Sequence, residues 1–214
     1  MKVILSLTII FTAIALTSTN TPCDHGALDI PDKWIDMVDS CYDQMKNQVQ
    51  EELKASIQYL AMGAHFSKDT VNRPGFAKFF FNSASEERQH ALKLISYLLM
   101  RGKLTTVSDL IKKNIVPKIT IWHDGLRALK DALELEGNVT QKIQNVIKVC
   151  ETPLRADEKK FNDYHLVDYL TGEFLEEQYK GQQELAGKVS NLEKMKLTHK
   201  QLGEFMFDKK LLEE

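Results

Sequence analysis

The positions of its five prolines constrain the fold of this 214-residue chain more than any other feature of its sequence. Proline lacks a backbone donor and clashes with the preceding turn, so helix interiors exclude it. Between the prolines lie long blocks in which apolar residues recur at helical spacing, and no block alternates with period 2 over any length. We therefore predict an all-α protein with long helices at roughly 39–65, 75–100, 121–149 and 161–192, and a short fifth helix at roughly 198–211.

The four long helices fit a bundle better than a globin-like stack. A helix of about 27 residues is about 40 Å long, and helices of similar length pack side by side. The link between the second and third helices, about residues 101–120, is too long for a tight turn. At about 3.3 Å per residue it can run the length of the bundle, which makes the third helix parallel to the second and antiparallel to the first. The expected fold is a four-helix bundle with one long crossover.

The amino-terminal segment has the pattern of a targeting signal. Lys2 precedes an apolar run over residues 3–16, which is shorter than the roughly 20 residues of a membrane span. We expect a secretory signal peptide over 1–19, with its cleavage point left open, an extension over 20–35 and one domain over 36–214. A retained anchor or an N-terminal core helix is the alternative. With the signal removed, the chain is expected in the secretory pathway or outside the cell, and not in a membrane.

Acidic residues stand where the helices of a bundle should be apolar. Overall, 30 acidic residues balance 28 basic ones, which leaves no basic surface for a nucleic acid. Near the middle of each long helix, however, a polar side chain falls at an expected core position. A buried acid is costly unless it is paired or binds a metal. These positions are, in chain order, Glu52 and Tyr59, then Glu87 and His90 as a Glu-x-x-His pair, then Glu136 and Gln178.

Together these residues predict a metal site. Carboxylates with a single imidazole suit iron or manganese, and three carboxylates with one histidine can hold two iron ions. Glu86 either points outward or serves as an alternate ligand beside Glu87. Tyr59 is either a core tyrosine bonded to one of the acids or a redox group, and the neutral Gln178 is a weak ligand that would orient water or oxygen. Any one of these acids taken alone is better explained as a solvated surface residue.

Four sequence motifs resemble those of ferritin heavy chains, and in particular the secreted heavy chains of insects. The motifs cover residues 52–59, 86–91, 132–136 and 174–178, and the resemblance extends over residues 35–214. It implies a ferritin-like four-helix bundle with one long crossover and a short fifth helix. It also implies a hollow shell, expected to contain 24 subunits and to include light chains, in which iron is stored as ferric mineral.

The resemblance also implies a role for each candidate position. In the family, the counterparts of Glu52, Glu87 and His90 hold one iron. The counterpart of Glu87 also bridges to a second iron, which the counterpart of Glu136 holds. A ferroxidase centre that takes two iron ions per subunit and oxidises Fe(II) with dioxygen or peroxide is therefore expected. Its catalytic residues would be Glu52, Tyr59, Glu86, Glu87, His90, Glu136 and Gln178, and all of these except Tyr59 and Glu86 are also expected to contact the metal.

Several surface positions bear on how the shell works. Asp168 keeps one acid of the pair that lines the family's three-fold iron channel, but the partner position is Thr171, and Glu173 is the acid that could replace the lost charge. Leu202 and Met206 of the fifth helix are expected to line the apolar four-fold contact, unless that helix packs only on its own bundle. A mixed shell is favoured because the Glu-rich surface on which light chains nucleate mineral corresponds here to Lys78, Phe81, Asn82 and Ser85.

The three cysteines suit the oxidising compartment that a signal peptide implies. Cys41 lies near the start of the first helix and Cys150 near the end of the third, so the antiparallel arrangement brings them to the same end of the bundle. We predict an intrachain Cys41–Cys150 disulfide, which leaves Cys23 for a partner chain. Three free buried thiols are the alternative. The glycosylation triplet at Asn138 lies inside the third helix, and we expect it to be unused.

Two other functions fit part of the pattern. A non-catalytic structural or iron-transport subunit of a shell would share the fold but has no physical need for acids in its core. A di-iron oxygenase acting on an organic substrate would use a second Glu-x-x-His motif, whereas the fourth helix offers only Glu177 and Gln178. A ferroxidase and iron-storage subunit is therefore the leading hypothesis.

Overall fold

The computed structural model describes residues 31–102, 110–111, 115–152 and 162–214. The predicted signal peptide, most of the N-terminal extension and Cys23 lie outside these residues. Inside them the chain is helical and has no strand, which confirms the all-α prediction. None of the described helices is long and apolar enough to cross a membrane.

Helices account for most of the described chain. In chain order they are η1 (Asp32–Trp34), α1 (Asp39–Ser67), α2 (Pro74–Met100), α3 (Gly125–Glu151), α4 (Tyr164–Tyr169), the π-helix η2 (Leu170–Leu175) and α5 (Glu176–Glu213). The predicted fourth helix corresponds to α4, η2 and the first part of α5. At Lys200 the backbone turns to φ 50°, and the rest of α5 folds back as the predicted fifth helix.

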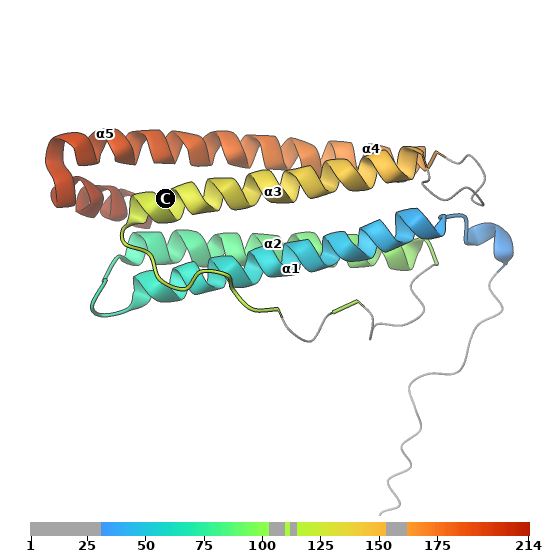
Figure 1. Ribbon diagram of the computed structural model, residues 1–214, viewed down its shortest axis with the longest axis horizontal. Helices are drawn as coiled ribbons and strands as arrows, with labels where there is room; N and C mark the ends of the chain where they lie inside the picture. Colours follow the sequence, from blue (N-terminus) through green and yellow to red (C-terminus); the bar gives the residue numbers. More distant parts are fainter. Residues whose placement is uncertain (1–30, 103–109, 112–114, 153–161) are drawn as a thin grey trace, which may run out of the picture. The chain divides into compact units, whose positions relative to one another are not determined.

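The helices run in the directions that a long crossover requires (Figure 1). A short turn joins α1 to the antiparallel α2, and α3 runs in the same direction as α2. The described end of the crossover is fixed to α1 by Gln58, whose amide nitrogen donates to the Ile119 carbonyl (2.8 Å). The Gln58 side-chain oxygen accepts from the backbone nitrogens of Lys118 (2.8 Å) and Ile119 (3.2 Å). The four-helix bundle with one crossover is thereby confirmed.

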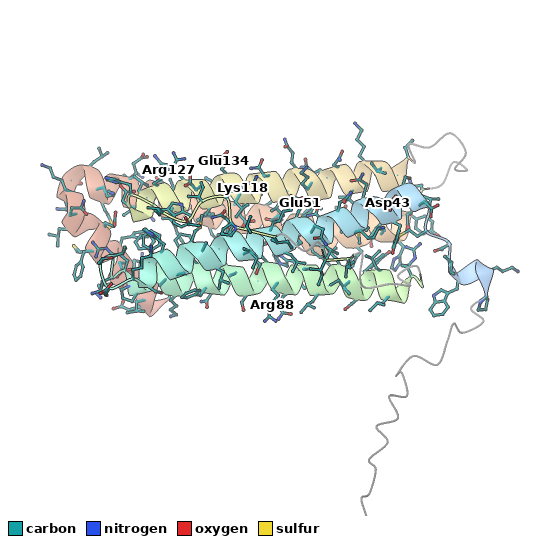
Figure 2. The ribbon with its side chains drawn as sticks, turned by 60° about the horizontal axis from the view of Figure 1, so that its bottom comes forward. Asp43, Glu51, Arg88, Lys118, Arg127 and Glu134 are labelled. Carbon is teal, nitrogen blue, oxygen red and sulfur yellow. A yellow bond between two sulfur atoms is a disulfide. The ribbon has the colours of Figure 1, made fainter. Side chains whose placement is uncertain are left out.

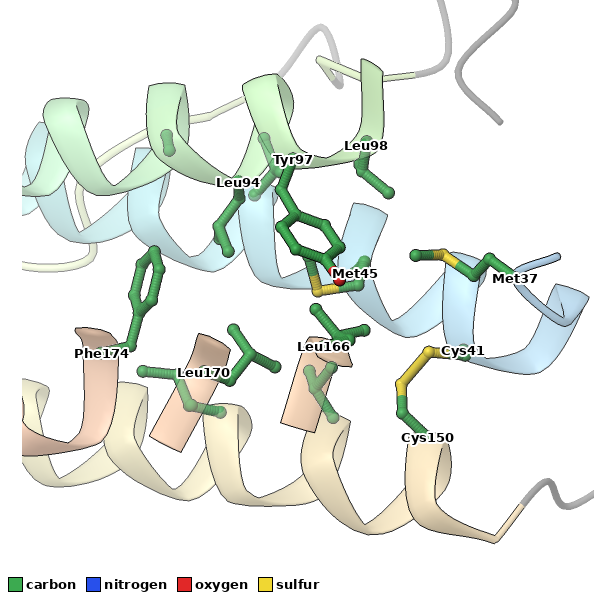
Figure 3. Packing of buried hydrophobic residues seen from close by; sticks show 14 of the residues in the cluster. Met37, Cys41, Met45, Leu94, Tyr97, Leu98, Cys150, Leu166, Leu170 and Phe174 are labelled. Carbon is green, nitrogen blue, oxygen red and sulfur yellow. A yellow bond between two sulfur atoms is a disulfide. The ribbon is translucent and has the colours of Figure 1, made fainter. Parts of the chain in front are cut away.

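Two apolar clusters fill the bundle, one toward each end. The first includes Met45, Leu94 and Leu98, with Leu166 and Leu170 opposite them (Figure 3). The second is rich in aromatic rings, and there Phe66 stacks on Phe76 and Phe80 with centroids 5.1 and 5.6 Å apart. Along α2, α3 and α5, the candidate metal-site residues fall at the border between the two clusters.

The buried faces of the helices agree with the predicted stripes except in α1. On α2 and in the fourth helix the expected apolar residues are buried. On α1 the buried face passes through Val49, Glu52 and Tyr59, whereas Leu60, which is also spaced at the helical repeat from Val49, is 49% exposed. Each residue rotates the side chain by about 100° around a helix, so Leu60 points away from the face that Tyr59 occupies.

The third and fourth helices begin later than predicted, because an aspartate caps each one. The Asp124 side chain accepts from the Arg127 nitrogen (2.8 Å), so α3 begins at Gly125 and not near residue 121. Asp163 likewise accepts from the Leu166 nitrogen (3.2 Å) before α4.

The folded-back end of α5 closes one end of the bundle. The buried Asp208 carboxylate accepts from the backbone nitrogens of Gly75 (2.8 Å) and Phe76 (3.1 Å), and so caps α2. Gly75 allows this approach, since a Cβ there would lie 1.8 Å from the Asp208 carbonyl oxygen. Leu202 and Met206 face outward from this segment and are 57% and 53% exposed.

The other end of the bundle is held by a disulfide and by a buried arginine. Cys41 and Cys150 are bonded, with an S–S distance of 2.07 Å, and this bond joins α1 to α3. Arg101, just after α2, donates to Asp163 before α4 (2.9 Å) and to Asp36 before α1 (2.6 Å). Together these contacts tie all four helices of the bundle. Many other charged side chains lie on the outer faces, among them Asp43, Glu51, Arg88, Lys118, Arg127 and Glu134 (Figure 2).

Candidate metal centre

Three residues of the predicted site form a compact, buried group of metal-ligating side chains. Glu52 comes from α1, and Glu87 and His90 come from α2, where their spacing of three residues places them on one face. One ligand atom from each residue lies within 4.8 Å of those of the other two. All three side chains are buried, so the group stands in the core and not on a solvated face.

Glu136 of α3 forms the other half of the site. The Tyr59 hydroxyl donates to its Oε1 atom, and Gln178 of α5 faces it. A cavity of about 130 Å³ lies between these groups and α2. The candidate residues that line this cavity are Tyr59, Glu86, Glu87, His90, Glu136 and Gln178. Glu52 joins the group through Glu87.

Burial and mutual repulsion raise the pKa values of these acids. Burial is the largest cause for Glu52, and the neighbouring charge of Glu87 adds to it, so the Glu52 pKa is well above its ordinary value. Burial and the charge of Glu136 raise the pKa of Glu87 to about 8. Burial also raises the pKa of Glu136, although the Tyr59 hydrogen bond opposes this. Without a bound cation, the site therefore keeps protons on carboxyl groups that would be ionised if they were exposed to water.

Several atoms of the site are buried without a hydrogen-bond partner. They are Glu52 Oε2, Glu87 Oε2 and His90 Nδ1. The other oxygen of Glu52 accepts a hydrogen bond from the Gln48 amide nitrogen at 2.9 Å. Buried polar groups are normally paired, so unpaired oxygen and nitrogen atoms gathered in one place fit a bound cation. Carboxylates with one imidazole are a donor set that iron accepts.

Glu86 lies at the mouth of the cavity. Its side chain is exposed but still lines the cavity, and partial burial raises its pKa. Its exposure agrees with the outward position that the sequence left open, and its role as an alternate ligand remains a prediction.

Glu177 lies beside the site, although the sequence pattern did not identify it as a site residue. Its Oε2 atom lies 3.4 Å from His90 Nε2 and 3.4 Å from Lys93 Nζ. Burial alone would raise the Glu177 pKa, but His90 and Lys93 together lower it. Glu184, seven residues later on α5, also lines the cavity. That spacing places both acids on one helix face. It is the sequence pattern from which their position beside the site could have been predicted.

The residues predicted for channels lie away from this centre. Asp168 lies near the carboxyl end of α4, and Thr171 and Glu173 lie in the π-helix η2. All three side chains are exposed. Neither they nor the outward-facing Leu202 and Met206 line the cavity. Their predicted roles concern contacts between subunits and remain predictions.

The chain was compared with known protein families, sequences and structures. A profile of the ferritin-like domain matches residues 42–195. The chain is 58% identical to a ferritin heavy chain of Trichoplusia ni over 94% of this chain and 92% of that one. It is 53% identical to a ferritin heavy chain of Drosophila melanogaster, over 98% and 99% of the two chains. The crystal structure of Trichoplusia ni secreted ferritin superposes with a TM-score of 0.83 at 58% identity, covering 91% of this chain and 99% of that one.

Proposed function

This chain belongs to the ferritin family, whose members form multi-subunit shells that store iron, and we propose that it is a ferroxidase subunit of such a shell. The observation that carries the proposal is the group of unpaired buried atoms on Glu52, Glu87 and His90, with Glu136 close by. A subunit that served only as a wall would be more stable with apolar residues at these positions.

We propose that two Fe(II) ions are the substrate and that dioxygen or peroxide is the oxidant. Glu52 and His90 would hold the first ion, Glu136 the second, and Glu87 would contact both. Binding displaces the protons that these acids retain, since a divalent cation favours their ionised forms. The chain supplies a preformed set of ligands on four rigid helices, so little reorganisation accompanies the reaction.

The remaining residues of the cavity would control the second ion and the exit of product. Tyr59 donates to Glu136 and so orients this carboxylate. Gln178 is neutral and binds a ferric ion weakly, which suits a site whose product must leave. Glu86, Glu177 and Glu184 lie at the open side of the cavity and offer further oxygen ligands along a route to the surface.

The assembly and compartment follow as parts of the same proposal. We propose a shell of 24 subunits mixed with light chains, because Lys78, Phe81, Asn82 and Ser85 provide no carboxylate for mineral nucleation. The apolar run after Lys2 and the similarity to a secreted ferritin support entry into the secretory pathway. The Cys41–Cys150 bond suits an oxidising compartment and leaves Cys23 for a partner chain.

The test compares Fe(II) oxidation by the assembled protein with that of a Glu52→Ala/His90→Ala variant. We expect the double variant to lose the rapid oxidation phase, because both side chains that complete the first iron site are gone. Glu51→Ala is the matched control, since Glu51 lies beside Glu52 but pairs with Lys54 on the surface. Equal rates in the double variant and wild type would reject a catalytic role for this centre. Particle size measured on the same samples would reject the shell if only monomers are found.

A further inference from the structure

A continuous row of aromatic rings leads from the candidate metal centre to the surface of the subunit. The row begins at His90, whose ring centroid lies 5.7 Å from that of Phe174. Phe174 lies 5.7 Å from Tyr169, which stacks on Tyr97 at 4.7 Å. The row ends at His165, 5.7 Å from Tyr97. Figure 3 shows Phe174 and Tyr97 entering the same apolar cluster from opposite sides of the bundle.

The π-helix η2 makes this row possible. Tyr169 and Phe174 are five residues apart, and in an α-helix they would point in directions about 140° apart. A π-helix bonds residues five apart, so Tyr169, just before η2, and Phe174, inside it, come to one side. The π-turn at Leu170–Leu175 thus brings the Phe174 ring into contact with both His90 and Tyr169.

The outer end of the row has the hydrogen bonds that tyrosine oxidation requires. The Tyr97 hydroxyl lies 2.7 Å from His165 Nδ1 and accepts a hydrogen bond from Arg101 at 2.9 Å. With the imidazole proton on Nε2, His165 Nδ1 accepts the phenolic proton of Tyr97. Tyr97 is buried and His165 is exposed. Both line a surface groove of about 520 Å³ together with Tyr169.

We propose that Tyr97 and Tyr169 form a one-electron relay that supplies the metal centre when peroxide meets a single bound Fe(II). The proposal rests on the ferroxidase function proposed above. Phe174 is not oxidised itself, because a phenyl ring is much harder to oxidise than a phenol. It fills the space between Tyr169 and His90 with contacting atoms, and so shortens the gap across which the electron passes.

The electrons and protons balance as follows. Hydrogen peroxide becomes two waters by taking up two electrons and two protons, and solvent supplies both protons. Fe(II) gives one electron and becomes Fe(III), and Tyr97 gives the other through Tyr169 and Phe174. The O–H bond of Tyr97 breaks, its proton moves to His165 Nδ1, and a neutral tyrosyl radical remains. A small ene-diol reductant in the groove then returns one electron to Tyr97, and His165 returns the proton. Without the relay, the missing electron is taken from side chains at the centre.

The test uses the assembled full-length protein, loaded anaerobically with one Fe(II) per subunit and mixed with an equal amount of hydrogen peroxide. Samples are frozen rapidly and examined by electron paramagnetic resonance. We expect a tyrosyl signal in wild type that Tyr97→Phe loses and that ascorbate quenches. Tyr169→Phe, which keeps the ring in place, is expected to reduce the signal as well. Peptide mass spectrometry of both variants should show more oxidation at His90 than in wild type.

Two controls make the outcome decisive. Tyr179→Phe removes an exposed tyrosine of α5 outside the row and should leave the signal unchanged. Tyr59→Phe removes the tyrosine beside Glu136, and a signal lost only in this variant would overturn the relay. A signal of wild-type size in both Tyr97→Phe and Tyr169→Phe would also overturn it. Failure of wild type to oxidise Fe(II) at all is a separate result, which would reject the proposed function and the relay with it.

Discussion

Two clusters of buried charge lie along α2, one near its middle and one just after its end, and their charges are balanced differently. At the end, the Arg101 guanidinium lies between the carboxylates of Asp36 and Asp163 and bonds to both. In the middle, Glu87 faces Glu52 and Glu136. Among the residues that the structure describes, no lysine or arginine pairs with any of these three glutamates.

The difference distinguishes acids that stabilise the fold through a fixed partner from acids that need a bound ligand to balance their charge. A buried charge beside a permanent partner is complete in the folded chain, and removing either partner leaves the other exposed to the full cost of burial. The middle cluster lowers its charge only by retaining protons or by binding a cation. Burial alone therefore does not identify a site, but burial without a fixed counter-charge does.

The largest effect is expected for Arg101→Ala. This change leaves the buried Asp163 without its cation, and breaking a buried pair in this way costs about 3–5 kcal/mol of unfolding free energy. Guanidinium unfolding followed by circular dichroism measures the loss. Arg88→Ala, on the exposed face of the same helix, is the control and should change little. An Arg101→Ala variant as stable as Arg88→Ala would show that the end cluster contributes nothing.

The same isosteric change should destabilise the protein in the end cluster and not in the middle one. Asp163→Asn removes a charged acceptor from Arg101 and from the cap of α4, and we expect a loss of about 1.5–3 kcal/mol. Glu87→Gln removes a charge that its neighbours repel, so the iron-free protein should be no less stable at pH 8. Both values come from one unfolding series in the presence of a chelator. Equal losses in the two variants would contradict the comparison.

The third expectation concerns pH, and it is the smallest change in unfolding free energy when counted per pH unit. The ordinary pKa of a glutamate is near 4.5, and the folded chain raises that of Glu87 to about 8. Between these values the folded protein holds more protons than the unfolded one. The unfolding free energy of iron-free protein therefore falls as pH rises, by about 1.4 kcal/mol per pH unit for one such group. Glu87→Gln should flatten this slope, whereas Glu51→Gln should keep it. Parallel slopes would show that Glu87 ionises freely in the fold.

Much of this architecture follows from local patterns in the sequence. The long proline-free blocks set the helices, and the length of the crossover sets their directions. The centre was predictable because Glu87 and His90 are three residues apart on one helix, and because Glu52 and Glu136 interrupt apolar stripes. Each of these signals depends on the helical repeat and not on contacts between distant residues.

The features that the sequence did not reveal depend on long-range contacts or on irregular backbone. Arg101 and Asp163 are 62 residues apart, and the sequence around neither residue predicts that they form an ion pair. The π-turn in η2 has no known local signature in this sequence, yet it decides which way Phe174 points. The late start of α3 could in principle be predicted from the sequence, because aspartate is a favoured N-cap residue and Asp124 occupies that position.

The central claim is that the uncompensated acids of the middle cluster bind iron. The most direct measurement is anomalous diffraction at the iron edge from crystals soaked with Fe(II) without oxygen. The account predicts one peak among Glu52, Glu87 and His90 and a second between Glu87 and Glu136, with both lost in Glu87→Gln. Iron-soaked wild-type crystals with no peak between these side chains would contradict it.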